Sequence, residues 1–209
     1  KNASCSPRSR NTSRRNPGDI FRPLSTRPVL GEADWPGYGR RLTALAARMA
    51  DFGVRMAYHH HMGTIVQSEA DIDRLMAHTG PEVGLLFDSG HCLFAGADPA
   101  AVLARHLARV VHVHCKDVRR TVLDQALVSD LSFMDAILAG VFTVPGDGCI
   151  AFPALLAQLQ RRAYAGWLVV EAEQDPRIAH PLTYARMGHD NLRAMALAAG
   201  LAVAGSPNE

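Results

Sequence analysis

Histidine and acidic residues gather at four separate places along the chain, each at the end of a short, mostly apolar run. The four sets are His59-His60-His61, Asp88 with His91, His112 and His114 with Lys116 and Asp117, and Glu171 with Glu173 and Asp175. Imidazole nitrogen and carboxylate oxygen together suit Mn²⁺, Co²⁺, Zn²⁺ or Fe²⁺, and a set without thiolate argues against a purely structural zinc site. A lone histidine is more often an ordinary polar residue, but four successive sets are hard to explain by packing, because buried charge is costly without a partner. The pattern predicts a divalent-metal site if the four runs end near one another.

The apolar runs alternate with segments of helical periodicity. Residues 54–58, 83–87, 110–114 and 167–170 have the length and nearly continuous apolar character of parallel strands. Apolar side chains at three- and four-residue intervals and the turn residues between them predict helices over residues 35–52, 69–78, 99–107, 131–139, 152–162 and 183–199. We therefore expect an α/β fold in which about four β/α units follow one another with parallel strands.

Repeated β/α units bring the carboxyl ends of their strands to one side of the molecule. In a TIM-like (β/α)₈ barrel that side carries the active site, so side chains that are distant in the sequence become neighbours there. A doubly wound sheet also binds ligands at its strand ends, so this argument alone leaves both architectures open.

Several stretches resemble the inosose dehydratases, a family within the xylose-isomerase-like barrels. They are YHHHMGT (58–64), FDSGH (87–91), VHVHCKD (111–117), GVF with PGDG (140–142 and 145–148) and GWLVVEAEQDP (166–176), within a similarity that covers residues 26–198. The resemblance implies a partial TIM-like (β/α)₈ barrel made of the C-terminal β/α units.

The resemblance also implies a set of metal ligands, with Mn²⁺ or Co²⁺ as the usual metal. A Glu, an Asp, a His and a second Glu hold the metal in that superfamily, and the last three match Asp88, His114 and Glu171. The place of the first Glu falls at or next to His59. Strand parity puts His59 and His61 on the same side, opposite to His60, and leaves open which of the two replaces that Glu.

The implied reaction is the dehydration of 2-keto-myo-inositol (scyllo-inosose) to a trihydroxycyclohexane-1,2-dione. A metal bound to the ketone would act as a Lewis acid. His91 and Lys116 each lie close to an implied ligand in the sequence, and we expect them to contact the substrate and transfer protons, with His61 as a further substrate contact. Ordinary solvation beyond a strand end is the alternative for His91 and Lys116. Glu173 and Asp175 are expected either to orient a ligand or to be solvated, and Pro145–Gly148 to form a turn.

Only about half of a (β/α)₈ barrel is visible in the sequence. We expect residues 26–200 to be its C-terminal half, residues 1–25 a basic leader that is disordered or not native, and residues 201–209 a tail. Open sheet edges favour association, so a homo-oligomer is expected. We also expect the isolated chain to have little or no dehydratase activity.

Composition separates these expectations from other classes of protein. The net charge is +2, residues 1–30 hold seven basic residues against one acidic residue, and the four cysteines form no CxxC pair. We therefore expect a reduced, cytoplasmic protein that binds a small polyol ketone, and neither a membrane nor a nucleic acid. A sugar isomerase or epimerase of the same superfamily, a metal-dependent endonuclease with the same barrel and a non-catalytic fragment are the competing hypotheses.

Overall fold

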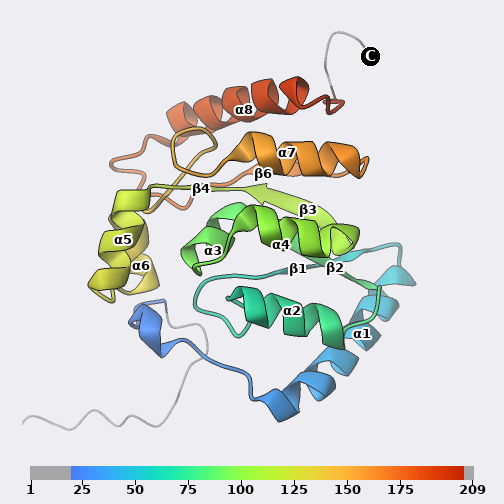
Figure 1. Ribbon diagram of the computed structural model, residues 1–209. Helices are drawn as coiled ribbons and strands as arrows, with labels where there is room; N and C mark the ends of the chain where they lie inside the picture. The colour runs from blue at the N-terminus through green and yellow to red at the C-terminus, as the bar shows by residue number, and fades with distance from the viewer. Residues whose placement is uncertain (1–19, 205–209) are drawn as a thin grey trace, which may run out of the picture.

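A four-stranded parallel sheet organises the protein. The structure is a computed structural model that describes residues 20–204. The strands are β1 (Met56–His59), β2 (Val83–Asp88), β3 (Val110–Cys115) and β6 (Leu168–Val170), and they lie in the order β1-β2-β3-β6 with every pair parallel (Figure 1). Strands, intervening helices and sheet order confirm the prediction of a partial TIM-like barrel.

Five helices cover one face of this sheet. They are α1 (Trp35–Ala50), α2 (Glu69–His78), α4 (Pro99–His106), α7 (Phe152–Arg161) and α8 (Pro181–Ala198) (Figure 1). Alternate strand residues point towards them, and Leu85, Phe87 and Val113 are buried in the core that these helices share with the sheet. All five helices were predicted to within two residues at both ends.

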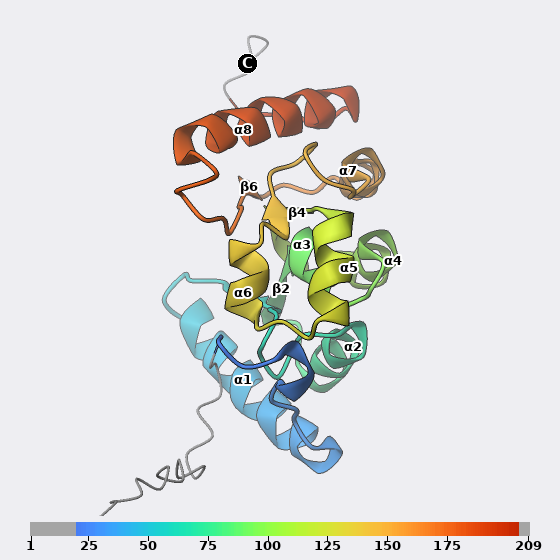
Figure 2. The same ribbon diagram turned by 90° about the vertical axis from the view of Figure 1, so that its left-hand side faces the viewer.

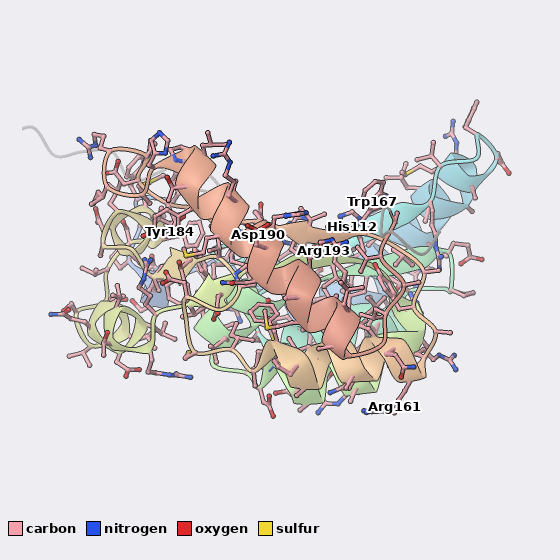
Figure 3. All side chains as sticks on the ribbon, turned by 90° about the horizontal axis from the view of Figure 1, so that it is seen from above. His112, Arg161, Trp167, Tyr184, Asp190 and Arg193 are labelled. Atoms are coloured by element: carbon pink, nitrogen blue, oxygen red, sulfur yellow. The ribbon has the colours of Figure 1, made fainter. Side chains whose placement is uncertain are left out.

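The opposite face of the sheet is more open. Leu86, His112 and Val169 lie on it and are only partly buried. Trp167, which directly precedes β6, and His112 of β3 are both labelled in Figure 3, and the Val113 N–H donates to the Trp167 carbonyl at 3.2 Å. The Trp167 side chain is 74% exposed. In a closed barrel this face would line the interior.

A second cluster of short elements lies at the carboxyl ends of the strands. It contains α3 (Ser89–Phe94), α5 (Arg120–Val128), α6 (Phe133–Leu138) and the antiparallel pair β4 (Asp117–Val118) and β5 (Phe142–Thr143) (Figure 2). Their apolar side chains form a small core of their own, which includes Phe94, Leu123, Phe133 and Phe142. The sequence analysis predicted α6 within residues 131–139 but not α3, α5, β4 or β5.

The first described residues pack against this second cluster. Ile20 accepts a hydrogen bond from the Met134 N–H, and the Ser25 hydroxyl donates to Asp130 at 2.6 Å. Short 3₁₀ helices, η1 (Leu24–Thr26) and η2 (Glu32–Asp34), lead into α1, and η3 (Leu107–Arg109) leads into β3. Residues 20–25 were assigned to the leader and here contact the folded body, whereas residues 1–19 lie outside the described part, as do residues 205–209 of the predicted tail.

Two glycines of α1 provide a matched test of helix packing. A Cβ at Gly39 would collide with the backbone carbonyl of His78 at the end of α2, whereas a Cβ at Gly37 would meet only the flexible Arg41 and Arg40 side chains, at 3.4 and 4.0 Å. We expect Gly39→Ala to lower the free energy of unfolding by about 2 kcal/mol through overpacking. We expect Gly37→Ala to raise it by about 0.5 kcal/mol, because alanine loses less backbone entropy in a helix. Urea unfolding checks both variants, and equal effects at the two positions would contradict the close α1–α2 contact.

The start of α2 carries a capping box with a charged partner. Ser68 is the N-cap residue, and Asp71 accepts hydrogen bonds from its N–H at 2.9 Å and its hydroxyl at 2.7 Å. Arg27 lies 2.9 Å from the same carboxylate. Burial alone would raise the pKa of Asp71, but the Ser68 hydrogen bonds and the Arg27 charge outweigh it and lower the pKa.

This lowered pKa makes the contribution of Asp71 depend on pH. A carboxyl group whose pKa is lower in the folded state stabilises the fold above its unfolded pKa of about 3.9, and the contribution is lost as the pH falls through the folded pKa. We expect Asp71→Ala to lower the free energy of unfolding by about 1–2 kcal/mol at pH 7. The deficit should shrink below about pH 4. Urea unfolding at pH 7 and pH 3 measures this, with the exposed Asp124→Ala as control, and an equal deficit at both pH values would rule out a charge effect.

Candidate metal centre

The four sequence-predicted ligands converge at the carboxyl ends of the sheet strands. Asp88 ends β2 and pairs in register with His114 of β3, which pairs with Val169 of β6, two residues before Glu171. His59 ends β1. One ligand atom from each of His59, Asp88, His114 and Glu171 lies within 4.8 Å of the other three.

Asp88 is at the centre of this group. Its Oδ2 atom lies 3.3 Å from His59 Nε2 and 3.5 Å from His114 Nδ1. His114 Nδ1 also lies 2.8 Å from Glu171 Oε2. Two ligands on opposite sides of one ion are about 4.2 Å apart at metal–ligand distances of about 2.1 Å, so the spacing fits a single ion of this size. The mixture of imidazole and carboxylate donors fits Mn²⁺, Co²⁺ or Zn²⁺.

Local backbone structure holds Asp88 in this position. Asp88 is the N-cap of α3, where its Oδ1 atom accepts the His91 N–H at 2.8 Å, which leaves Oδ2 for the other ligands. The Asp88 N–H in turn donates to His60 Nε2 at 3.2 Å. His60 is fully buried, and burial lowers its pKa to about 4. His60 therefore lies on the buried side of Asp88. His59, at the end of β1, and His61, two residues beyond the strand, lie on the other side, as the parity argument predicted.

A second group lies beside the first and contains the predicted substrate-contact residues. Lys116 Nζ lies 2.7 Å from Glu173 Oε2 and 3.0 Å from His91 Nε2. His61 Nε2 lies 3.9 Å from Glu173 Oε1, and the His61 and His91 rings are 3.7 Å apart between centroids. His61, His91 and Glu173 also place three ligand atoms within 4.8 Å of one another.

Lys116 connects the two groups. Its Nζ atom is 3.0 Å from Glu171 Oε2 and 3.7 Å from Asp88 Oδ2. The Ser89 hydroxyl donates to the Lys116 carbonyl at 2.7 Å. Gly90 makes room for the lysine stem, because a Cβ at this position would lie 2.6 Å from Lys116 Cγ. The DSGH stretch therefore contains a predicted metal ligand, a hydroxyl group that anchors the Lys116 backbone and the space that the lysine side chain requires.

The charges of the site compensate one another. Burial alone would raise the pKa of Asp88, but the hydrogen bonds of His114 and His59 and the Lys116 charge hold it well below the usual range. Burial alone would lower the pKa of Lys116, but the carboxylates of Asp88, Glu173 and Glu171 raise it, so Lys116 stays an ammonium. Burial lowers the pKa of His91 well below its usual range.

His114 is the second cationic group. Burial alone would lower its pKa, but hydrogen bonds to Asp88 and Glu171 raise it to about 9. Burial alone would raise the pKa of Glu171, and the His114 hydrogen bond and the Lys116 charge lower it. A bound metal ion and the His114 proton would compete for the same nitrogen, because a ligand histidine must be neutral.

The side chains form a buried layer and a solvent-facing layer. Asp88, His91 and Lys116 are fully buried, whereas Glu171 is 35% exposed, Glu173 29% and His61 27%. The alternative of ordinary surface solvation for His91 and Lys116 is therefore wrong. Glu173, which the sequence analysis left between an orienting role and solvation, bonds directly to Lys116. Its position two residues after Glu171 was the signal for this, because such spacing puts both side chains on one side of an extended chain.

Two other predicted acidic residues serve the backbone. The buried Asp117 carboxylate accepts hydrogen bonds from the N–H groups of Val118, Gly146, Gly148 and Ile150, at 2.8–3.1 Å. It thereby fixes the Pro145–Gly148 segment, which is the turn that the sequence predicted. Asp175 bonds to Arg177, two residues further along the chain. Neither residue belongs to the two groups of ligand-type side chains.

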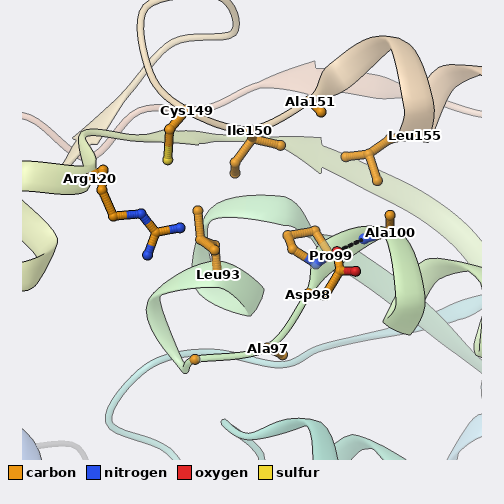
Figure 4. Close-up of a pocket in the computed structure, with 11 residues that line it drawn as sticks. Leu93, Ala97, Asp98, Pro99, Ala100, Arg120, Cys149, Ile150, Ala151 and Leu155 are labelled. Carbon is orange, nitrogen blue, oxygen red and sulfur yellow. Dashed lines mark hydrogen bonds between the residues drawn. The ribbon is translucent and has the colours of Figure 1, made fainter.

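A separate pocket lies away from these residues. It has a volume of about 460 Å³ and lies between the α3–α4 turn, the start of α5 and the segment that leads into α7 (Figure 4). Its polar side chains are Asp98, Arg120 and Cys149, and Asp98 is already engaged as the N-cap of α4. The pocket contains none of the predicted site residues.

No helix in residues 20–204 combines the length and the apolar character that crossing a membrane requires.

The sequence of this chain is similar to those of known proteins. Residues 18–195 match the family model described as xylose isomerase-like TIM barrel. The rhizopine catabolism protein MocC of Rhizobium meliloti is 62% identical over 181 residues, which cover 87% of this chain and 56% of that protein. Inosose dehydratase 2 of Bacillus cereus is 48% identical over 163 residues, which cover 78% of this chain and 55% of that enzyme.

A solved structure shows the same fold at low sequence identity. The probable 3-DHS dehydratase AsbF of Bacillus anthracis superposes with a TM-score of 0.62 at 13% identity, covering 83% of this chain and 60% of that one. The chain thus spans little more than half the length of the curated relatives that it matches. With the family model covering most of its length, the chain belongs to the xylose isomerase-like TIM barrel family.

Proposed function

We propose that this chain carries the metal-binding side of an inosose dehydratase-type active site. The proposed reaction is that of a carbon–oxygen hydro-lyase, which converts 2-keto-myo-inositol to a trihydroxycyclohexane-1,2-dione with Mn²⁺ or Co²⁺. The observation that carries the proposal is the convergence of His59, Asp88, His114 and Glu171 above the buried Lys116. The similarity to an inosose dehydratase over 78% of the chain supports the substrate class.

The metal and the protein contribute differently to this chemistry. His59, Asp88, His114 and Glu171 would hold a bound Mn²⁺ or Co²⁺. The ion would act as a Lewis acid on the ketone oxygen of the substrate. The residues that face solvent beside this group are His61 and Glu173. Lys116 holds Glu173 through a 2.7 Å ion pair and stays protonated, so the pair keeps an exchangeable proton next to the substrate position.

The reaction balances without any further reactant. A base removes the proton from the carbon next to the ketone, and the hydroxyl group on the following carbon accepts a proton as its C–O bond breaks. One water leaves, and the resulting enol tautomerises to the dione. We assign the two proton transfers to the set formed by His61, His91, Lys116 and Glu173, in which the buried Lys116 and His91 restore the protonation of the exposed Glu173 and His61.

A step in rhizopine breakdown is the second candidate. The higher identity to MocC, 62% against 48% for the inosose dehydratase, favours it. A substrate with the same ketone and neighbouring hydroxyl would use the same residues, so the two candidates differ in the substrate rather than in the metal centre.

We also propose that the open edges of β1 and β6 associate with another protein segment, and homo-oligomerisation is one way to cover them.

Metal and ligand binding test the proposed function. Calorimetric titration of the purified chain with MnCl₂ or CoCl₂ should show stoichiometric binding. Scyllo-inosose should then bind to the metal-loaded chain and not to chelator-treated chain, while myo-inositol, which lacks the ketone, should bind at least about 10-fold more weakly. A chain that binds no divalent metal, or that binds inosose equally well without metal, would contradict the proposal.

A further inference from the structure

The His61, His91 and Glu173 group has the composition of a metal site in its own right. Two histidines and one glutamate form the protein ligand set of some catalytic zinc sites. The His61 Nδ1–H donates to the Met62 carbonyl at 2.8 Å, which leaves Nε2 as the nitrogen with a lone pair, and such a bond behind the ring is typical of ligand histidines. His61, His91 and Glu173 place their ligand atoms within 4.8 Å of one another, as the first group does.

The lysine ammonium, however, lies within this second group. Lys116 Nζ is 2.7 Å from Glu173 Oε2 and 3.0 Å from His91 Nε2, so it engages two of the three ligand atoms. The side chain is fully buried. The Phe142 ring lies below Nζ, with 4.7 Å from Nζ to the ring centroid, and Gly90 lies against the stem, where a Cβ would be 2.6 Å from Lys116 Cγ. The packing thus fixes the ammonium where a second ion would bind.

We propose that the Lys116 ammonium takes the place of a second metal ion, so that the centre binds one divalent ion and His61, His91 and Glu173 stay free of metal. This inference rests on the proposed function, because it requires a metal ion at His59, Asp88, His114 and Glu171. It goes beyond that function by assigning the number of ions and the residue that sets it.

Charge balance supports a single ion. Asp88, Glu171 and Glu173 together carry three negative charges, which one divalent ion and one ammonium neutralise. A dication added beside the fixed ammonium would meet a like charge within a few ångströms in a buried site, where such repulsion is weakly screened. The two groups also share Lys116 as a neighbour, since Nζ is 3.0 Å from Glu171 and 3.7 Å from Asp88.

Counting bound Zn²⁺ in variants of the full chain tests the proposal. After exposure to excess ZnCl₂ and gel filtration, elemental analysis should find one ion per wild-type chain. Lys116→Met, which has a neutral side chain of similar length, should bind two ions, whereas Lys116→Arg, which keeps a cation, should bind one. The double variant Lys116→Met/Glu173→Gln should return to one, because it removes a ligand of the second group.

The outcomes separate this inference from the proposed function. Two ions in the wild type, or one ion in a folded Lys116→Met chain, would overturn the inference. A wild-type chain without bound metal would instead contradict the proposed function. Should Lys116→Met fail to fold, His61→Ala and Glu173→Gln in the wild-type background decide the question: both should keep one ion, and loss of that ion in either variant would overturn the inference.

Discussion

Asp88→Asn is expected to lower the affinity of the chain for Mn²⁺ or Co²⁺ by more than about 100-fold. Removing a residue that only orients a metal ligand lowers metal affinity by about 10–100-fold, and removing a ligand should lower it further. Asp88 is fully buried, and its Oδ2 atom lies between His59 Nε2 and His114 Nδ1, at 3.3 and 3.5 Å. An asparagine keeps the shape and the Oδ1 acceptor that caps α3, but it brings no charge to the ion. Calorimetric titration with the two metals at pH 7.5 measures the change.

Asp98→Asn is the matched control for this variant. Asp98 caps α4 through the Ala100 N–H as Asp88 caps α3, but it lies away from the four predicted ligands, in the wall of the separate pocket (Figure 4). We expect the affinity of Asp98→Asn to stay within about 2-fold of the wild type, since surface changes away from a site have little effect. Equal affinities of Asp88→Asn and the wild type would show that Asp88 is not a ligand.

Asp117→Ala is expected to lower the free energy of unfolding by about 4 kcal/mol. The buried carboxylate accepts four backbone N–H groups, and a hydrogen bond to a charged group contributes about 1.5–3 kcal/mol. These contributions are not additive, so the expected loss is below their sum. The change in the urea midpoint measures it.

Two further variants define what Asp117 contributes. Asp117→Asn keeps one acceptor oxygen and should lose about half as much stability as Asp117→Ala. The exposed Asp124→Ala should change stability by less than about 0.5 kcal/mol. A loss below about 1 kcal/mol in Asp117→Ala would mean that the 144–150 segment keeps its position without this carboxylate.

Local patterns were sufficient to predict the strands and the ionisable residues at their ends, whereas the choice of His59, Asp88, His114 and Glu171 as metal ligands came from the family resemblance. Apolar runs ended at ionisable residues, and parallel strands bring such ends together. Parity along β1 separated His59 and His61 from His60, and the structure confirms this separation, with His60 buried behind Asp88. That the gathered side chains bind a metal ion is still a prediction.

Other features depend on contacts that the sequence pattern does not contain. The sequence analysis treated the stretch from Asp88 to His91 only as the polar end of a strand. In the structure Asp88 caps the six-residue helix α3, whose helical pattern is too short to detect. The helix α5 was missed because only Leu123 and Ala126 are buried along its nine residues, which gives a weak apolar stripe. The burial of Lys116 requires the space at Gly90 and two glutamates that follow β6, Glu171 and Glu173, which lie about 55 residues further along the chain. The sequence pattern does not reveal that combination.

The contrast between the two tryptophans gives the protein two separate optical reporters. Trp35 is 1% exposed in the main core, and Trp167 is 74% exposed on the open face of the sheet. Iodide or acrylamide in the folded state should therefore quench the emission of Trp167 selectively, whereas the emission of Trp35 should shift to the red only when α1 leaves the core. A molecule or chain that covers the open face would protect Trp167 from the quencher, so docking there can be followed without any label.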